Sequence, residues 1–183
     1  MKAHVVRSLQ SGVVLLLASV LLNACGTADW QPHAANAEKI KPTDLAKAEA
    51  EYRQAIKVAE KGHVPETAYL SAIQGLGEVL LDEKKYGAAV PYLVKACQLA
   101  TATHMSDEAN IALLQKVVVA YENSGEPKEA VDTQSVLMTF LSVEKSPADP
   151  IFIKEKANQG RLEDQLASYN KAHLASKCCE HEQ

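Results

Sequence analysis

The sequence predicts an all-α protein, a short α-solenoid of helix pairs closed by a C-terminal helix. One pattern of large and small apolar residues recurs at a step of 41 residues, and apolar positions elsewhere follow the spacing of a helix face. No segment alternates apolar and polar residues as a half-buried strand does. Hydrophobic residues make up 47% of the chain but aromatic residues only 5%, so Ala, Leu and Val must fill the core. Small side chains in that proportion favour close packing of helices.

The composition excludes several classes of protein. A chain of 183 residues is typical of one domain or two small ones, and 23% charged residues is ordinary for a globular protein. The formal net charge of −4 argues against nucleic-acid binding, which needs a basic surface to neutralise the phosphates. We therefore expect no nucleic-acid partner.

The repeat is carried by two kinds of helix. In the later helix of each pair the copies are Ala48-x3-Tyr52-x2-Ala55, Ala89-x3-Leu93-x2-Ala96 and Ala130-x3-Gln134-x2-Leu137. In the earlier helix, Ile73-x2-Leu76-Gly77-x2-Leu80 maps onto Leu114-x2-Val117-Val118-x2-Tyr121 at the same step. The large residues make one helix face apolar, and small residues such as Gly77 let the neighbouring helix come close.

This pattern resembles the tetratricopeptide repeat (TPR). Residues 70–103 match best, and the third copy departs from the pattern at Gln134 and Leu137, which replace the usual aromatic residue and alanine. The apolar positions of the earlier helix in residues 70–103 have counterparts 41 residues before them. These counterparts form no apolar face; they are Pro32, Ala35, Asn36 and Lys39. We therefore expect about two and a half units over residues 43–144, preceded by a tether over residues 25–42.

Local signals place the helix ends. We expect a first helix from a cap at Thr43 to Lys61 and Gly62, a second from Pro65 to about Lys84, and a third from Tyr86 to Ala102. Ser106 caps a fourth that ends near Ser124 and Gly125, and Pro127 starts the fifth. Asp149 and Pro150 begin a last helix that reaches about residue 176. The segment 145–177 would cover the exposed end of the stack, as solenoids require.

The first residues have the order of an export signal. Lys2 and Arg7 precede an apolar run, 13–22, that is too short to span a membrane. Leu22-Asn23-Ala24-Cys25 resembles the lipobox of bacterial lipoproteins, which implies removal of residues 1–24 and a lipid on Cys25; the alternative is an ordinary signal peptide with an incidental cysteine. Gly26 and Thr27 resemble the outer-membrane class of these lipoproteins. The mature chain would carry a net charge of −6, so the lipid would have to anchor it without attraction to anionic lipids.

The sequence contains no motif of catalysis. It has no glycine-rich phosphate loop, no Gly-x-Ser-x-Gly and no His-Glu-x-x-His, so we expect no enzyme activity, no cofactor and no metal. The C-terminal tail, 178–183, leaves three alternatives open: a metal site, a disulfide or an unstructured tail. His173, Cys178, Cys179 and His181 are soft or borderline metal ligands that lie close together. In an oxidising compartment Cys178 or Cys179 can instead form a disulfide, within the chain or in a dimer.

The resemblance to TPR proteins implies a binding groove lined by the first helix of each unit. The corresponding residues are Ser71, Gln74, Glu78, Leu81 and Asp82 in the best-matching unit, and Ala112, Gln115, Val119, Glu122 and Asn123 in the next. TPR arrays that clamp a C-terminal carboxylate carry Lys and Asn at such positions, whereas Gln and Glu stand in this chain, so that mode is not expected. A groove that is partly acidic and partly apolar would suit a basic or amphipathic segment of a partner. The alternative is a merely solvated helix face.

These observations predict a lipoprotein of the bacterial outer membrane that faces the periplasm. It would act as a non-catalytic adaptor or assembly factor for an envelope protein whose identity the sequence does not define. The alternative function is that of a small metal- or redox-handling lipoprotein that uses the Cys/His tail.

Overall fold

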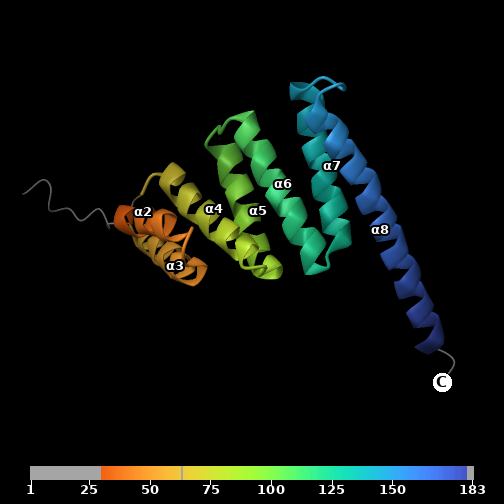
Figure 1. Cartoon of the computed structure of the whole chain (residues 1–183), viewed down its shortest axis with the longest axis horizontal. Helices are drawn as coiled ribbons and strands as arrows, with labels where there is room; N and C mark the ends of the chain where they lie inside the picture. Colours follow the sequence, from red (N-terminus) through yellow and green to blue (C-terminus); the bar gives the residue numbers. More distant parts are fainter. Residues whose placement is uncertain (1–29, 63, 181–183) are drawn as a thin grey trace, which may run out of the picture.

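The computed structural model describes residues 30–62 and 64–180, with side chains described up to residue 172. The lipobox and the last three residues lie outside this part of the chain. The described residues form helices and no strand, and the helices follow one another along the molecule (Figure 1). Their bounds are α2 Gln31–Ile40, α3 Leu45–Lys61, α4 Glu66–Asp82, α5 Tyr86–Ala102, α6 Asp107–Ser124, α7 Pro127–Glu144 and α8 Pro150–Glu180.

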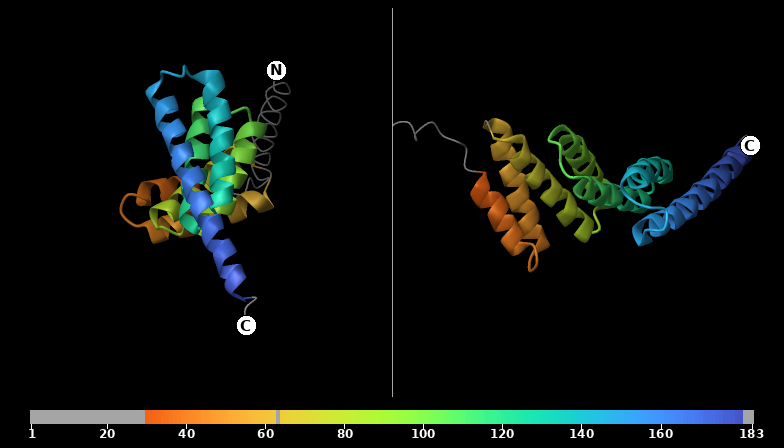
Figure 2. Two further views of the ribbon diagram at one scale, coloured as in Figure 1. Left: turned by 90° about the vertical axis from the view of Figure 1, so that its right-hand side faces the viewer. Right: turned by 90° about the horizontal axis from the view of Figure 1, so that it is seen from above.

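The helices pack as successive pairs. α2 pairs with α3, α4 with α5 and α6 with α7, and each helix contacts mainly the helices that precede and follow it in the sequence. One continuous core runs from Ala37 in α2 to Ala120 in α6, and two smaller clusters join α6, α7 and α8. The right-hand view in Figure 2 shows the same succession of helices from above. The predicted fold class, an all-α solenoid of helix pairs with a C-terminal helix, is confirmed.

Residues 31–40 form helix α2 where the sequence led us to expect part of a tether. α2 packs against α3 through Ala34 and the fully buried Ala37. Hydrogen bonds from His33 and Asn36 to Glu51 join the two helices at 2.6 and 3.2 Å. The described chain therefore holds three helix pairs, not two and a half.

The 41-residue repeat did not predict α2 because the connection that follows α2 differs in length from the one in the next pair. The connection from α2 to α3, residues 41–44, is one residue longer than the connection 83–85 in the next pair. Ala34 and Ala37 therefore correspond to Leu76 and Val79 at a step of 42 residues. The strict step of 41 lands instead on four exposed residues, which are Pro32, Ala35, Asn36 and Lys39.

Most helix ends lie where local signals place them. α5 has the expected bounds, the Ser106 side chain accepts a hydrogen bond from the Ala109 N–H at 3.4 Å, and α6 ends at Gly125 in the left-handed conformation, with φ +84°. The cap of α3 differs by one residue: Asp44 accepts from the Lys47 N–H at 3.0 Å, so the cap predicted at Thr43 is wrong. The Thr43 hydroxyl instead donates to a carbonyl at the end of α2.

Two glycines allow α4 to lie close to both of its neighbours. A Cβ on Gly77 would stand 2.7 Å from Cδ2 of Leu93 in α5, and a Cβ on Gly75 would stand 2.3 Å from Cε1 of Tyr52 in α3. Leu93 is therefore the residue of α5 that contacts Gly77. Gly77 sets the spacing within the pair, and Gly75 sets the spacing to the preceding pair.

Helix α8 covers the end of the array with only its first part. Ile151 and Phe152 pack against the cluster around Leu137, and Leu162 is 1% exposed. Tyr169, which lies level with the start of α7, is already 46% exposed. α8 is longer than α7, so its C-terminal part extends past the array, as Figure 1 shows.

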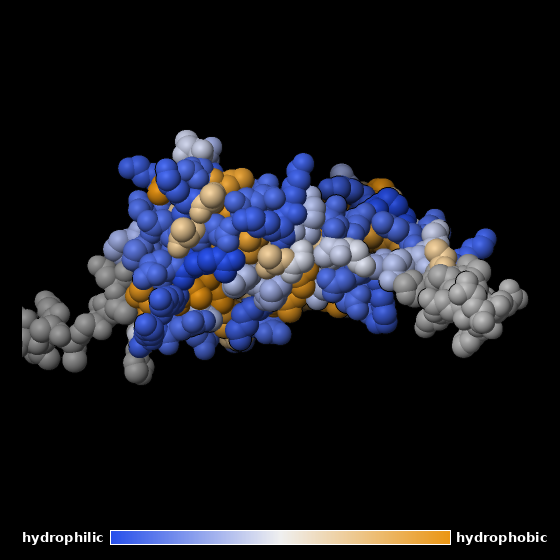
Figure 3. Space-filling view, turned by 90° about the horizontal axis from the view of Figure 1, so that it is seen from below, coloured by the Kyte–Doolittle hydropathy of each residue, from blue (hydrophilic) through white to orange (hydrophobic). Residues whose placement is uncertain are grey.

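The surface carries no broad apolar face on the side drawn in Figure 3, where hydrophobic residues show between hydrophilic ones. The large exposed hydrophobic residues of the described chain lie on α6, α7 and α8; they are Val119, Val136, Val143, Ile153 and Tyr169. Within the described part, none of the helices combines the length and the apolar character needed to cross a bilayer.

Candidate functional site

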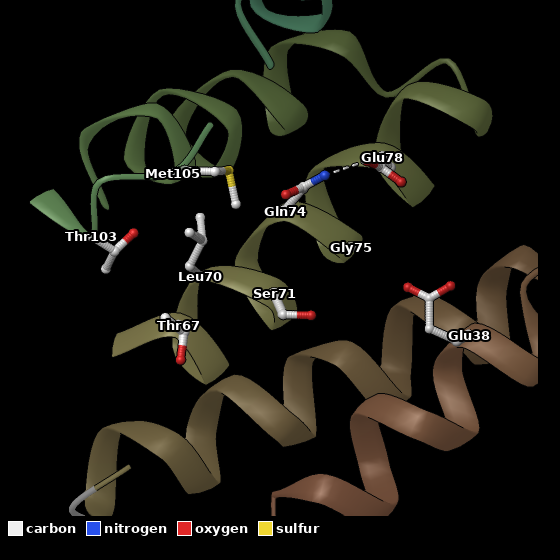
Figure 4. A pocket seen from close by; sticks show the side chains of 9 residues that line it. All are labelled: Glu38, Thr67, Leu70, Ser71, Gln74, Gly75, Glu78, Thr103 and Met105. Carbon is white, nitrogen blue, oxygen red and sulfur yellow. Dashed lines mark hydrogen bonds between the residues drawn. The ribbon is translucent and has the colours of Figure 1, made fainter. Parts of the chain in front are cut away.

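A hollow of about 300 Å³ lies beside α4, and we call it the α4 hollow (Figure 4). Figure 4 shows Glu38 of α2 on one side of α4 and Thr103 and Met105 on the other. Its lining residues are Glu38, Thr67, Leu70, Ser71, Gln74, Gly75, Glu78, Thr103 and Met105. Three of the predicted groove residues, Ser71, Gln74 and Glu78, are thereby brought together.

Gly75 lines the α4 hollow, and Tyr52 of α3 packs against it from behind. Because Gly75 has no side chain, the Tyr52 ring fits against the backbone of α4 and its hydroxyl donates to the Glu38 carboxylate. Burial, followed by the hydrogen bond to Glu38, raises the pKa of Tyr52 well above its usual value. Tyr52 therefore stays neutral and holds Glu38 at the edge of the hollow.

Glu78 lies between two lysines that come from different parts of the array. Lys41, in the connection after α2, donates to Glu78 Oε2 at 2.8 Å, Lys116 of α6 donates to Oε1, and Gln74 adds a third hydrogen bond at 3.0 Å. Burial by itself raises the pKa of Glu78, but the hydrogen bonds from Lys116, Lys41 and Gln74 outweigh it and lower the pKa to about 2. Glu78 is thus charged and already paired, and it joins three helix pairs.

The remaining predicted residues of α4 lie apart from the hollow. Leu81 packs against the hydrophobic core, and Asp82 is exposed at the end of the helix. Neither lines the α4 hollow.

A second depression, of about 540 Å³, lies between α6, α7 and α8, and we call it the α6–α8 cleft. It brings together Gln115, Val119 and Glu122, three more of the predicted residues. Asn123 does not line it; its amide donates to the carbonyl of Val119 within α6. Ala112 is exposed on the same helix and lines neither depression.

Sequence analysis missed the residues that α7 and α8 contribute to the α6–α8 cleft. Gln134 is fully buried and donates to the Glu155 carbonyl at 2.9 Å and to Glu155 Oε2 at 3.1 Å. The signal was present in the repeat, because Gln134 stands one step after Leu93 and two after Tyr52. A polar side chain at a core position needs a buried polar partner, and α8 supplies it.

The cysteines add no site within the described residues. Cys97 is a free, half-buried thiol whose pKa is raised to about 11 by burial, which makes it a poor nucleophile at neutral pH. Over the described ranges, no three His, Cys, Asp or Glu side chains are grouped as metal ligands. Cys25, His181 and the side chains of His173, Cys178 and Cys179 lie outside what the structure describes.

Comparison with known proteins yields structural likeness only. No protein-family model and no curated protein matches the chain. Among solved structures, a single-residue variant of a Podosopora anserina putative kinesin light chain with TPR-like repeats has 15% identity and a TM-score of 0.58, over 74% of this chain and 65% of that one. The N-terminal domain of stress-induced protein-1 (STI-1) from C. elegans has 16% identity and a TM-score of 0.54, over 75% and 99%.

The apo form of RapI also matches, with 12% identity and a TM-score of 0.57 over 87% of this chain and 57% of that one. The chain therefore spans less than two thirds of the kinesin light chain variant and of RapI. At such identities the likeness concerns backbone architecture, and it agrees with the helix pairs described above. The protein is an α-solenoid of TPR-like helix pairs.

Proposed function

We propose that the protein is a non-catalytic scaffold that binds a partner polypeptide along the first helices of its repeats. The observation that carries this proposal is the α4 hollow, where polar groups from Ser71 and Gln74 meet the apolar side chains of Leu70 and Met105. Such a mixed surface suits an amphipathic or basic segment. TPR-like architecture supports the same function, because its pairs stack into an extended surface.

We further propose that a lipid on Cys25 anchors this scaffold to the outer membrane, facing the periplasm. Support comes from the sequence alone: the basic residues, the apolar run, the small residue and the cysteine stand in the order of a lipobox. Gly26 after the cysteine favours the outer membrane over the inner one. The partner would then be an envelope protein.

Cys25→Ser tests the anchor. Without the sulfur that carries the lipid, the chain should either remain unprocessed or appear in the soluble fraction, whereas the unaltered chain should fractionate with membranes. Cell fractionation and the mass of the purified chain measure both outcomes. Gly26→Asp, which keeps Cys25, serves as the companion variant and should move the protein towards the inner membrane. A Cys25→Ser chain that has lost residues 1–24, as its mass would show, and still fractionates with membranes like the unaltered chain would refute the lipid anchor.

Ser71→Arg tests the α4 hollow. Ser71 is exposed on α4, so a long cationic side chain should fill the hollow without disturbing the core. Gln54→Arg makes the same change of charge at an exposed position of α3 outside the hollow. Proteins captured from solubilised envelope should include at least one that Ser71→Arg loses about tenfold and Gln54→Arg retains. Identical capture by the two variants would show that the hollow is not the binding surface.

A further inference from the structure

Glu155 is a buried carboxylate in the wall of the α6–α8 cleft. Its side chain is 5% exposed, yet the hydrogen bonds it accepts come from neutral amides, Gln115 Nε2 at 2.9 Å and Gln134 Nε2 at 3.1 Å. Among the described residues, only Lys154 brings a positive charge within 4.0 Å of it. The Lys154 Nζ atom lies 3.9 Å from Glu155 Oε1, and the Lys154 side chain is 77% exposed. A buried charge is normally paired at hydrogen-bond distance, and Glu155 is not.

Two other charged residues of the cleft, Glu122 and Arg161, are already paired with each other. Arg161 donates to both carboxylate oxygens of Glu122 and to Asn158 Oδ1. Glu155 is therefore the carboxylate of the cleft that lacks a close cation. Val118 and Val119 of α6 form an apolar wall beside it. A long apolar stem that ends in a positive charge complements this arrangement, and Lys and Arg side chains have that form.

We propose that the α6–α8 cleft takes up a Lys or Arg side chain of a partner polypeptide, with the cationic end paired to Glu155. Lys154 is the weak counter-ion that the incoming side chain displaces. This inference rests on the proposed scaffold function and adds the chemistry of the partner. The proposed site includes residues of α7 and α8, which are not among the groove positions predicted from the TPR resemblance. It lies at the end of the array opposite α2.

A pair of fluorescent peptides tests the cleft: one with Lys residues in a neutral polar sequence, and one with Gln at the same positions. Fluorescence anisotropy measures their binding to the full chain purified in detergent. The Lys peptide should bind more tightly than the Gln peptide. Glu155→Gln should weaken binding of the Lys peptide about tenfold, because it removes a charge-assisted hydrogen bond. Lys154→Gln should strengthen it several-fold, because it removes the competing cation.

Matched controls lie on the same helix. Asp164→Asn and Lys156→Gln make the same changes of charge at exposed positions outside the cleft, and each should alter the affinity less than twofold. If Glu155→Gln and Asp164→Asn weaken binding equally, the peptide is held only by general attraction to an acidic chain, and the proposal is overturned. Equal affinity for the two peptides, or unchanged binding in Lys154→Gln, would also overturn it. So would a free diamine that competes as tightly as the Lys peptide, since the site would then be one for small amines.

The two readouts separate this inference from the function on which it rests. Lys154 is exposed, so its variant reports on the cleft even where Glu155→Gln impairs folding. Loss of capture by Ser71→Arg together with failure of the peptide assay would leave the scaffold intact and reject only the cleft. If Ser71→Arg captures the same proteins as Gln54→Arg and the peptide assay also fails, the scaffold is rejected as well.

Discussion

Gly77→Leu should destabilise the protein, although leucine is the better helix former by about 1 kcal/mol. A Cβ at this position would stand 2.7 Å from Leu93 Cδ2 and 2.8 Å from Leu93 Cγ, and Leu93 is itself fully buried. The larger side chain must therefore push α4 and α5 apart. Overpacking of a core typically costs about 1–3 kcal/mol, so the packing cost should exceed the gain in propensity. Thermal unfolding of the purified protein, followed by circular dichroism, measures the sign.

Ser71→Leu provides the control on the same helix. Ser71 is exposed, so helix propensity acts there without overpacking, and the midpoint should stay close to that of the unaltered protein. Gly75→Leu should behave like Gly77→Leu, because its Cβ would meet the Tyr52 ring. A higher midpoint for Gly77→Leu would mean that α4 and α5 do not pack at this distance.

Glu78→Gln should lower the free energy of unfolding at neutral pH by roughly 2–3 kcal/mol. The neutral amide would leave Lys41 and Lys116 close together without the negative charge that both now share. The pKa of Glu78 is lowered from 4.5 to about 2 in the folded protein, so its contribution to stability is complete above pH 4.5. The contribution is lost as the pH falls from 4.5 towards 2, where the carboxylate takes up a proton.

The measurement is urea unfolding of both proteins at several pH values from 7 to 2. The difference in free energy between the unaltered protein and Glu78→Gln should be largest near pH 7 and should shrink below pH 4.5. Asp82→Asn, four residues later and exposed, makes the same chemical change outside this cluster and should have little effect at any pH. A constant difference across the range would show that Glu78 acts through packing and not through its charge.

The groove residues of α4 differ in what spacing along one helix could predict about them. Ser71, Gln74 and Glu78 were predicted to share one face of a helix, and in the structure all three line the α4 hollow. The spacing could not show that Glu78 is already occupied by two lysines, because Lys41 and Lys116 come from other helix pairs. Sequence spacing describes one helix at a time, whereas an ion pair depends on the distance between helices.

The sequence by itself determined the helical class, the pairing of α4 with α5 and of α6 with α7, and most helix ends. Those features depend on local physics: the apolar period, the capping residues, and proline or glycine at helix ends. Only the tertiary structure decided that residues 31–40 form a helix, because their buried face is made of alanines and one extra residue in the connection shifts the register. It alone also joined Glu155 to Gln134 and Gln115, since α8 returns to α6 across α7 over some 40 residues of chain. The repeat marked Gln134 as a polar residue at a core position, but its partner depends on how whole helices pack, which no local signal encodes.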